Sequence, residues 1–351
     1  IYLEEYLSLV KDKYIRRSLI KLGYETINSS YVTSLSLESI LTEVENKLFN
    51  LTNEVKSQKL STSAELVNTI FFELKNKSLN PKLSGVSSGF YDLDALTQGF
   101  QKSDLIIVAG RPSMGKTSLS LNIASNVIKN SKLPVLFFSL EMSKEQIMYK
   151  LLSMETNINQ MRLKGGKLYQ NDWIKLTKMI KIISKFPLFI DDTFNLSIQD
   201  IKSKIKTILF EQNQLGLVII DYIQLMQTTN FENENRVQEL SKITRSLKKI
   251  AREFNIPIIG LSQLSRNVEN RVDKKPILSD LRESGSIEQD ADLVIMLYKN
   301  KLENSSASQS TSKTSKSIEL IIAKHRNGPT GTVQLKFHEE QTKFFNKETN
   351  F

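Results

Sequence analysis

Cysteine is absent from this chain of 351 residues, and histidine occurs only as His325 and His338. The first absence excludes disulfides, thiolate nucleophiles and zinc sites with cysteine ligands. The second leaves little material for histidine-rich metal sites or for Ser-His-Asp catalysis. Chemistry in this chain therefore has to come from carboxylates, amides, hydroxyls, basic side chains and backbone groups.

Long hydrophobic runs are also missing. The longest, such as Leu105–Ala109 and Leu217–Ile220, have the length of a strand and are too short to cross a bilayer. No charged segment followed by an apolar one opens the chain, so nothing indicates secretion and we expect no membrane partner. The chain begins at Ile1 and enters a helical pattern at once, which we interpret as a fragment or processed product without its true N-terminus.

The formal net charge is +10. A solvated lysine-rich surface explains this excess as well as a binding surface for a polyanion does, so the charge alone only favours a nucleic-acid partner. Hydrophobic residues make up 40% of the chain, which is enough to bury a core of ordinary size. Richness in Lys, Asn and Ile is typical of an AT-rich genome, bacterial or plastid. The locations we expect are cytoplasmic (nucleoid), or the plastid stroma if the chain is organelle-encoded.

Residues 1–60 contain no glycine except Gly23, and apolar residues recur there at helical spacing. Ile15, Leu19 and Leu22 are one example of this spacing. The pattern predicts two or three helices that form part of an all-helical domain.

A further helix is predicted over Ser63–Lys77, where Ser and Thr are N-cap candidates and apolar residues form a stripe. The breaker residues Asn80, Pro81 and Gly85 follow it. These patterns predict three parts, namely a partial helical N-terminal domain at 1–60, a linker helix and connection at 61–84, and an α/β domain at 85–351.

Short aliphatic strands alternate with longer amphipathic stretches from about Gly89 onwards. Most strands are uninterrupted apolar runs, which predicts the α/β class with a mostly parallel central sheet covered by helices on both faces. The Ser-rich segment Ser305–Ser317 is predicted to be a mobile surface loop, and Val333–Phe337 is predicted to be the final edge strand. The other predicted strands are Leu105–Ala109, Val135–Ser139, Leu188–Asp191, Leu217–Asp221, Ile256–Leu261, Leu293–Leu297 and Ile318–Ala323.

The segment from Gly110 to Thr117 fits the P-loop pattern G-x-x-x-x-G-K-[ST] at every fixed position. It follows a predicted strand and opens a helix predicted over Ser118–Lys129, which is the setting that the motif requires. Backbone N–H groups of such a loop point at phosphates, Lys116 reaches the β- and γ-phosphates, and the Thr117 hydroxyl binds Mg²⁺. A glycine-rich turn with an exposed lysine would not explain every fixed position. We therefore predict ATP and Mg²⁺ as ligands, with the nucleotide-binding residues Gly110, Arg111, Pro112, Ser113, Met114, Gly115, Lys116, Thr117 and Ser118.

Three polar residues at the ends of predicted strands complete the candidate site. Asp221 ends an apolar strand in the form that holds Mg²⁺ beside a P-loop, although an ordinary Asp at a turn has the same pattern. Tyr222 follows it, so the base that activates water has to come from elsewhere. Glu141, at the end of the neighbouring strand, is the candidate, with a surface helix cap as the alternative. Gln263 follows another strand and either contacts the γ-phosphate or is an ordinary polar strand end.

Six segments in a fixed order are similar to the motifs of the DnaB-type replicative helicases, and the resemblance covers nearly the whole chain. It implies a RecA-like motor domain of which six copies form a ring around single-stranded DNA. The function implied is that of an ATP-dependent helicase that moves 5′ to 3′ and unwinds the replication fork, with primase and a helicase loader as further partners. The segments are Gly110–Thr117, Phe138–Met142, Val218–Leu225, Gly260–Arg266, Ser279–Asp292 and Lys324–Pro329.

The resemblance also implies roles for single residues. Glu141 matches the catalytic glutamate, Asp221 the Mg²⁺-associated aspartate, and Gln263 the γ-phosphate sensor that couples hydrolysis to movement. Lys324 and Arg326 match a pair that enters the neighbouring subunit's site, where an arginine supplied in trans stabilises charge on the transferring phosphoryl group. Hydrolysis would then require assembly.

Arg282, Glu283 and Gly285 match the loop that holds the DNA backbone in this family. The Arg282 guanidinium and the Gly285 N–H would grip phosphate without reading bases, while Glu283 would orient neighbouring donors. Aromatic residues are not interleaved here, which favours backbone tracking over base stacking. The chain departs from the family in three respects: only the latter part of the N-terminal domain is represented, Lys150 stands where an arginine is more usual, and His325 stands where Gln is common.

The helix over Ser63–Lys77 resembles the family's linker helix, which docks on the adjacent motor domain. Phe71 and Phe72 would be its anchors, and packing within its own chain is the alternative. Two other functions stay open at this point. One is a RecA-type recombinase or clock-type ATPase with the same core, and the other is an assembly module that binds nucleotide without turnover. The motif around Arg282 favours the helicase.

Overall fold

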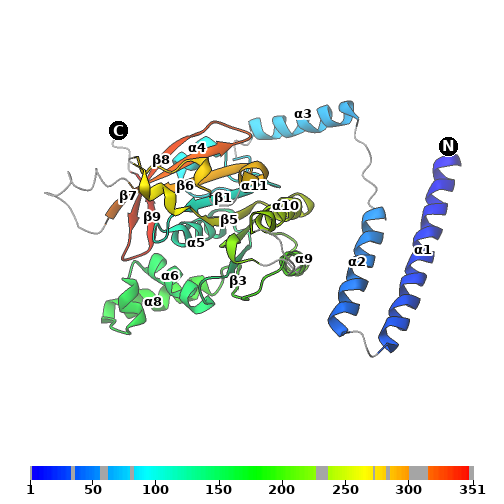
Figure 1. Cartoon of the computed structure of the whole chain (residues 1–351), viewed down its shortest axis with the longest axis horizontal. Coiled ribbons are helices and arrows are strands. Elements are labelled where there is room, and N and C mark those ends of the chain that lie inside the picture. Colours follow the sequence, from blue (N-terminus) through cyan, green and yellow to red (C-terminus); the bar gives the residue numbers. More distant parts are fainter. Residues whose placement is uncertain are drawn as a thin grey trace. The chain divides into compact units, whose positions relative to one another are not determined.

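The computed structural model describes residues 2–32, 36–55, 62–79, 83–226, 236–271, 273–281, 285–299 and 315–347. The chain divides into two compact units, Ile1–Pro81 and Lys82–Phe351 (Figure 1). The first unit is helical and the second is an α/β domain. None of the helices in the described ranges is long and apolar enough to pass through a membrane.

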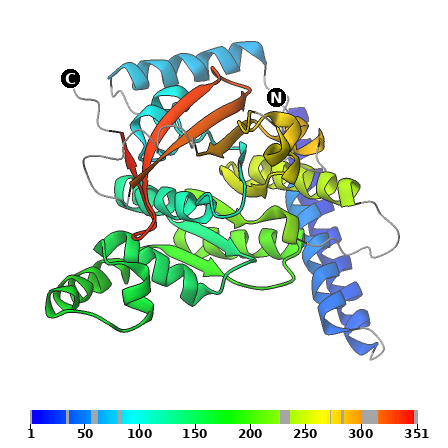
Figure 2. The ribbon, with the colours of Figure 1, turned by 60° about the vertical axis from the view of Figure 1, so that its left-hand side comes forward.

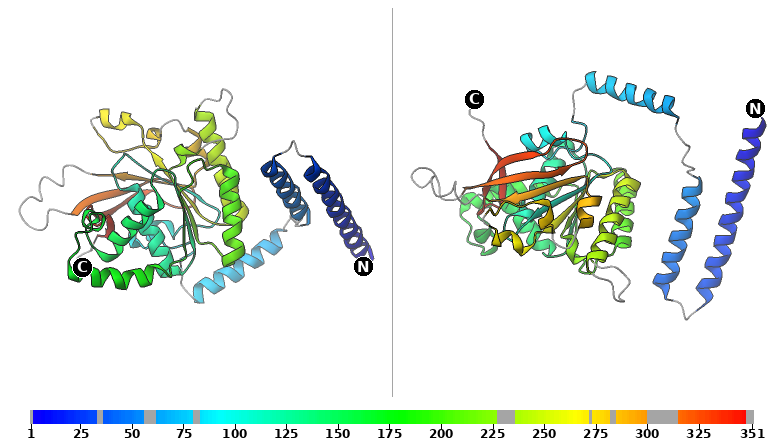
Figure 3. Two further views of the ribbon diagram at one scale, coloured as in Figure 1. Left: turned by 90° about the horizontal axis from the view of Figure 1, so that it is seen from below. Right: turned by 45° about the horizontal axis from the view of Figure 1, so that its top comes forward.

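Helices in the first unit confirm the helical pattern of the sequence. Two of them, α1 and α2, run antiparallel to each other (Figure 3). Lys47 on α2 joins them, because its Nζ lies 2.8 Å from Glu25 on α1 and 2.7 Å from Glu43 on its own helix. These side chains are exposed, so the ion pairs contribute little to stability. The helices are α1 (Tyr2–Tyr31), α2 (Leu37–Val55) and α3 (Ser63–Leu79).

A nine-stranded sheet forms the centre of the second unit, in the order β3-β2-β4-β5-β1-β6-β7-β8-β9. The strands from β3 to β6 in this order are parallel, and β7, β8 and β9 continue the sheet with antiparallel pairing. The mostly parallel sheet predicted from the sequence is therefore confirmed. The strands are β1 (Leu105–Gly110), β2 (Val135–Ser139), β3 (Leu188–Asp191), β4 (Leu217–Asp221), β5 (Ile258–Gln263), β6 (Leu293–Tyr298), β7 (Ser315–His325), β8 (Gly331–His338) and β9 (Lys343–Asn346).

The C-terminal edge of the sheet differs from the prediction. Strand β8 contains Val333–Phe337 but pairs with β7 on one side and β9 on the other, so β9 is the edge strand (Figure 2, orange and red). The sequence pattern missed β9 because it is four residues long and follows a short polar turn. Ser315–Ser317, predicted as loop, belongs to β7. The rest of that predicted loop, 305–314, lies outside the described residues.

Helices cover both faces of the sheet. Ile106 and Val108 of β1 belong to the core that includes α4, α5 and α6, whereas Leu105 and Ile107 belong to the core that includes α9, α10 and α11. This alternation follows from the pleat of a strand whose two faces are both buried. The helices are α4 (Tyr91–Thr97), α5 (Lys116–Asn126), α6 (Lys144–Thr156), α7 (Gln160–Lys164), α8 (Gln170–Ile183), α9 (Ile198–Gln212), α10 (Arg236–Phe254) and α11 (Gly285–Asp290).

Helix α5 follows the central strand β1 and differs slightly from the helix predicted there. It begins at Lys116, two residues earlier than predicted, and a π-helical turn over Val127–Ser131 replaces its last predicted turn. Leu119, Leu121 and Ile123 on this helix are fully buried, so several sides of α5 contact the core. This burial fixes the N-terminus of α5, where the P-loop ends.

Candidate nucleotide-binding site

The P-loop connects β1 to α5. Gly115, just before α5, has φ of +88°, a left-handed conformation that glycine adopts without steric cost. A Cβ atom here would also lie 3.2 Å from the ring of Phe344 and 3.4 Å from the ring of Phe337. These two rings stack with their centroids 4.4 Å apart. The C-terminal strands β8 and β9 therefore provide an aromatic surface against which the loop packs.

Lys116 folds back over the loop. Its Nζ donates to the carbonyl oxygen of Gly110 at 2.8 Å and to that of Arg111 at 3.3 Å. Burial lowers the pKa of the Lys116 ammonium, and the carboxylates of Asp221 and Glu141 oppose this effect. A phosphate beside Lys116 would stabilise the charged form of the lysine further. The loop therefore offers a partly desolvated cation to a phosphate.

Thr117 and Asp221 form the candidate magnesium site. The Thr117 hydroxyl donates to Asp221 Oδ2 over 2.6 Å, and Asp221, at the end of β4, is only 1% exposed. Burial raises the pKa of Asp221, as does the charge of Glu141, while the Thr117 hydrogen bond opposes them. Hydroxyl and carboxylate oxygens are ligands that Mg²⁺ prefers, and the ion usually takes its other ligands from phosphates and water. This fits the described part of the chain, in which no group of three or more His, Cys, Asp or Glu residues could hold a metal alone.

A cavity of about 530 Å³ lies over the P-loop. Parallel strands bring their carboxyl ends to one edge of the sheet, which is why residues at the ends of β1, β2, β4 and β5 meet there. Its volume and its mixture of basic, acidic and hydroxyl groups suit a nucleoside triphosphate. The lining includes nine residues that the sequence predicts for the site, namely Pro112, Ser113, Gly115, Lys116, Thr117, Ser118, Glu141, Asp221 and Gln263.

Three of the predicted nucleotide-binding residues are not among those that line the cavity. The Arg111 guanidinium contacts Glu269 instead, with Nη2 2.8 Å from the carboxylate. Met114 packs against the hydrophobic core. Gly110 supplies the carbonyl oxygen that accepts a hydrogen bond from Lys116. In this structure these residues shape the loop.

Glu141 and Gln263 reach the cavity from two different strands. Glu141 follows β2, which lies next to β4 in the sheet. Gln263 is the last residue of β5, in register with Gly110 at the end of β1, and its backbone N–H donates to the side chain of Gln224 at 3.4 Å. Gln263 thus lies between the P-loop and the segment after β4. This place suits a residue that senses the γ-phosphate.

Five further residues line the cavity although the sequence did not assign them to it. Lys150 on α6 adds a second cation, and burial lowers its pKa while Asp221 and Glu141 oppose that effect. No local pattern distinguishes Lys150 from other lysines on an amphipathic helix, so its only signal in the sequence is its position relative to the family motif. Glu339 follows β8, nearly two hundred residues further along the chain. The five residues are Met142, Lys150, Tyr222, Phe337 and Glu339.

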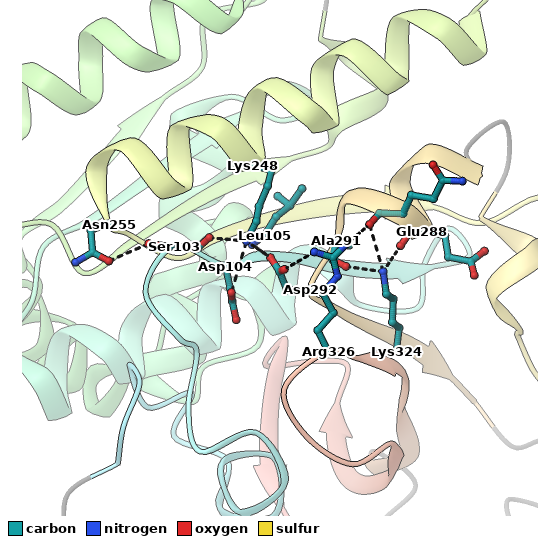
Figure 4. A network of polar contacts seen from close by, with 11 residues as sticks. Ser103, Asp104, Leu105, Lys248, Asn255, Glu288, Ala291, Asp292, Lys324 and Arg326 are labelled. Carbon is teal, nitrogen blue, oxygen red and sulfur yellow. Dashed lines mark hydrogen bonds and ion pairs between the residues drawn. The ribbon is translucent and has the colours of Figure 1, made fainter. Parts of the chain in front are cut away.

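Lys324 and Arg326 do not line this cavity. They lie at the end of β7 and directly after it, and their side chains contact Asp292, Ala291 and the last turn of α11 (Figure 4). The Arg326 side chain is 48% exposed. A residue that enters a neighbouring subunit has to be exposed, so this position is compatible with the predicted role. The role itself stays a prediction.

The predicted DNA-binding loop is only partly described. Gly285 is the first residue of α11, and Arg282 and Glu283 lie outside the described residues. Just before the loop, Leu281 forms a β-bridge with Leu264, the residue after Gln263. The segment that enters the loop is therefore joined directly to the strand that carries Gln263.

A P-loop between a central parallel strand and a buried helix, opposite a carboxylate at the end of a nearby strand, defines a P-loop NTPase. The family of the DnaB-like helicase C terminal domain matches residues 85–346. The chain belongs to this DnaB-like helicase family.

Curated relatives and solved structures are similar over most of the chain. A probable replicative DNA helicase of Trieres chinensis is 64% identical and covers 98% of this chain and 75% of its own length. The replicative DNA helicase DnaB of Geobacillus stearothermophilus is 43% identical, with 99% and 76% covered. A solved DnaB-like replicative helicase, described with its interactions with primase, has a TM-score of 0.82 at 34% identity and covers 98% of this chain and 79% of its own. A separately solved ATPase domain has a TM-score of 0.74 at 39% identity, with 83% and 100% covered.

Proposed function

We propose that this chain is the motor subunit of a replicative DNA helicase. It hydrolyses ATP to move 5′ to 3′ along single-stranded DNA and separates the duplex at the replication fork. The observation that carries this proposal is the cavity in which Lys116, Asp221 and Glu141 meet over the P-loop of a DnaB-like domain. Its curated relatives are replicative helicases that align with nearly the whole chain, which supports the same function here.

Each group in the cavity has a proposed role in hydrolysis. The P-loop N–H groups and Lys116 hold the β- and γ-phosphates. Thr117 and Asp221 hold Mg²⁺, which when bound neutralises charge on these phosphates. Glu141 orients the attacking water and accepts its proton, while Gln263 contacts the γ-phosphate and responds to its release.

The working enzyme in this proposal is a homo-hexamer. Lys324 and Arg326 of one subunit enter the nucleotide site of the next, where Arg326 stabilises the charge of the transferring phosphoryl group. The residues that line the cavity in the described part of the chain include two lysines but no arginine. An arginine from a neighbouring subunit would supply what the lining lacks.

DNA is the polymer along which we propose that the motor moves. Arg282, Glu283 and Gly285 would hold the backbone of single-stranded or forked DNA without reading its sequence. The net charge of +10 agrees with a polyanionic partner. The bridge between Leu281 and Leu264 offers a direct route from the γ-phosphate sensor to this loop.

Primase and a helicase loader are further proposed partners, and the first is supported by the solved relative described with its interactions with primase. We also propose the plastid stroma as the compartment. The relative from Trieres chinensis, a diatom, is 64% identical, compared with 43% for the bacterial relative from Geobacillus stearothermophilus. Subcellular fractionation of the source organism tests this location.

The proposed function is tested by measuring ATP hydrolysis with and without single-stranded DNA, together with strand separation on a forked duplex. We expect hydrolysis that DNA accelerates, and a Glu141→Gln variant that binds ATP but turns it over at least about 10²-fold more slowly. Glu145→Gln, an exposed change in the first turn of α6, is the matched control and should leave turnover unchanged. ATP binding without turnover would instead indicate an assembly module, and turnover without unwinding would indicate a recombinase or clock-type ATPase.

A further inference from the structure

Asp292 connects three parts of the motor domain just before β6. It is 5% exposed, and its two carboxylate oxygens have different partners. Oδ2 accepts a hydrogen bond from the backbone N–H of Leu105 at 2.9 Å and forms an ion pair with Lys248 of α10. Oδ1 accepts from Nη1 of Arg326 at 3.3 Å. One oxygen is therefore fixed to the start of the central strand and the other holds Arg326.

Backbone hydrogen bonds strengthen this connection. The N–H of Arg326 donates to the carbonyl oxygen of Asp292 at 2.9 Å, and the N–H of Asp292 donates to that of Leu105 at 2.9 Å. Arg326 is thus attached to Asp292 through both its backbone and its side chain. The base of the arginine side chain is fixed even though the side chain itself is 48% exposed.

The last turn of α11 and Ala291, which follows it, provide the second set of contacts (Figure 4). Lys324 Nζ donates to the carbonyl oxygen of Ala291 at 2.8 Å and to those of Gln289 and Glu288. Arg326 also donates to the carbonyl oxygen of Gln289. The final carbonyl groups of a helix have no partners within it, so the two cations satisfy acceptors that α11 leaves free. Both side chains are therefore held by these carbonyl groups, and Arg326 is held by Asp292 as well.

We propose that Asp292 is a positioning residue for Arg326, which it orients from within the same subunit toward the nucleotide of the neighbouring subunit. The inference rests on the proposed function, because it deepens the role given there to Arg326. Asp292 does not line the cavity of its own chain. Its effect on hydrolysis therefore passes through Arg326 and is exerted on the next subunit.

A purely structural role for Asp292 is the competing explanation. Its contacts with Leu105 and Lys248 join β6 to β1 and α10, and these would suffice for a residue that only stabilises the domain. A structural defect would impair the subunit's own nucleotide site and its arginine alike. A positioning defect would impair only the arginine, and this difference can be measured in rings that contain two kinds of subunit.

The experiment uses Asp292→Asn, which keeps the size of the side chain but removes its charge and places an amide against donors. We expect kcat for ATP hydrolysis to fall at least about tenfold with little change in KM or in the affinity for a fluorescent ATP analogue. Asp104→Asn is the matched control, because Asp104 also pairs with Lys248, at 3.6 Å, without contacting Arg326 in the structure. The control should retain wild-type kcat.

Mixed rings give the decisive comparison. Asp292→Asn subunits mixed with Lys116→Ala subunits should recover activity, since an intact P-loop then meets an intact Arg326 from its neighbour. Mixed with Arg326→Ala subunits they should recover none, because both variants lack the same half of the site. No recovery with Lys116→Ala would overturn the inference, provided that Arg326→Ala mixed with Lys116→Ala does recover. If that reference pair also fails, the shared site of the proposed function is wrong instead.

A second variant keeps the test decisive if Asp292→Asn does not fold. Asp292→Glu retains the charge for Lys248 but moves the carboxylate by one methylene, which should misplace Arg326. We expect the same pattern of recovery with Lys116→Ala and the same lack of recovery with Arg326→Ala. In an Arg326→Ala background, neither change at position 292 should reduce kcat further. An additional loss there would contradict action through Arg326.

Discussion

Burial shifts the pKa values of three residues that line the nucleotide cavity. It lowers the pKa of Lys116 and of Lys150, and it raises the pKa of Asp221, being the largest cause in all three. Two desolvated ammonium groups and a buried carboxylate are each stabilised when triphosphate and Mg²⁺ supply the opposite charges. The buried charges of these residues therefore favour binding of a highly charged ligand.

Lys150 allows a direct test of this view at the residue scale. We expect Lys150→Met to weaken ATP binding about tenfold, since a charge-assisted hydrogen bond contributes about 1.5 kcal/mol or more. The measurement is a titration with a fluorescent ATP analogue. Lys144→Met, in the first turn of the same helix, removes an exposed lysine that does not line the cavity and should leave the affinity unchanged. Equal losses in both variants would show that Lys150 acts only through general surface charge.

Asp104 provides a prediction about stability and pH. Burial, and then the charge of Asp292, raise the pKa of its carboxyl group, while Lys248 opposes them. The folded state then binds a proton more readily than the unfolded state, so this carboxyl group's contribution to stability is full below its unfolded pKa and is lost as pH rises through the raised pKa of the folded state. We expect Asp104→Asn, which cannot ionise, to be more stable than wild type at neutral pH, with the difference shrinking at acid pH. Urea unfolding at a series of pH values measures this.

A less stable Asp104→Asn variant at neutral pH would mean that the contact with Lys248, 3.6 Å away, outweighs the cost of burying the carboxylate.

The positions of individual site residues could be predicted where the residue belongs to a sequence motif or ends an apolar strand. Thr117, Asp221 and Gln263 follow from the P-loop and from apolar strands, since parallel strands end at the same edge of a sheet. Lys150 and Asp292 were not assigned from sequence, because their contacts come from helices and strands far away in the chain. For a polar residue on a helix or before a strand, no local sequence pattern predicts which distant residue it contacts.

Support for the P-loop comes from elements at the far end of the domain. Strands β8 and β9 place the stacked rings of Phe337 and Phe344 against Gly115. Gly115 therefore packs against residues more than two hundred positions later in the chain. The fold couples the C-terminal hairpin to the shape of the phosphate-binding loop.

Phe344→Ala tests this coupling at the scale of the element. Removing a ring that is 3% exposed leaves a cavity under the loop, which should cost about 3–5 kcal/mol in unfolding free energy and weaken ATP binding. Phe345→Ala is the control, because Phe345 is half-buried and contacts His338 instead. Thermal unfolding and nucleotide titration measure the two effects. An affinity that survives in a folded Phe344→Ala variant would show that the P-loop does not need this support.

Elements of the sheet were predicted well from their apolar runs, whereas α5 is the one covering helix of the second unit whose bounds were predicted from the sequence. The exception is the C-terminal edge, where β9 was missed and β8 was wrongly placed at the border. Uninterrupted apolar runs mark strands that are buried on both faces. A short strand such as Lys343–Asn346, with polar residues at both ends, lacks that mark and depends on pairing with β8.

At the scale of the whole molecule, we propose that the chain works as a directional DNA motor. The family, the RecA-like domain and the ordered motifs support it, and the exposure of Arg326 agrees with a site shared between subunits. The first unit adds helices whose apolar side chains are exposed, among them Ile70, Phe71 and Phe72. The sequence alone implied the ring only through the family resemblance, since the P-loop and the strand and helix patterns of this chain describe contacts within one copy.

Strand separation on DNA substrates with defined tails is the direct test of a motor that moves 5′ to 3′. One fork carries both a 5′ and a 3′ single-stranded tail, and two control duplexes carry only one tail each. We expect ATP-dependent separation of the fork, loss of separation when the 5′ tail is removed, and no separation by Glu141→Gln. Separation that needs only the 3′ tail, or a fork that stays paired while ATP is consumed, would contradict the proposal.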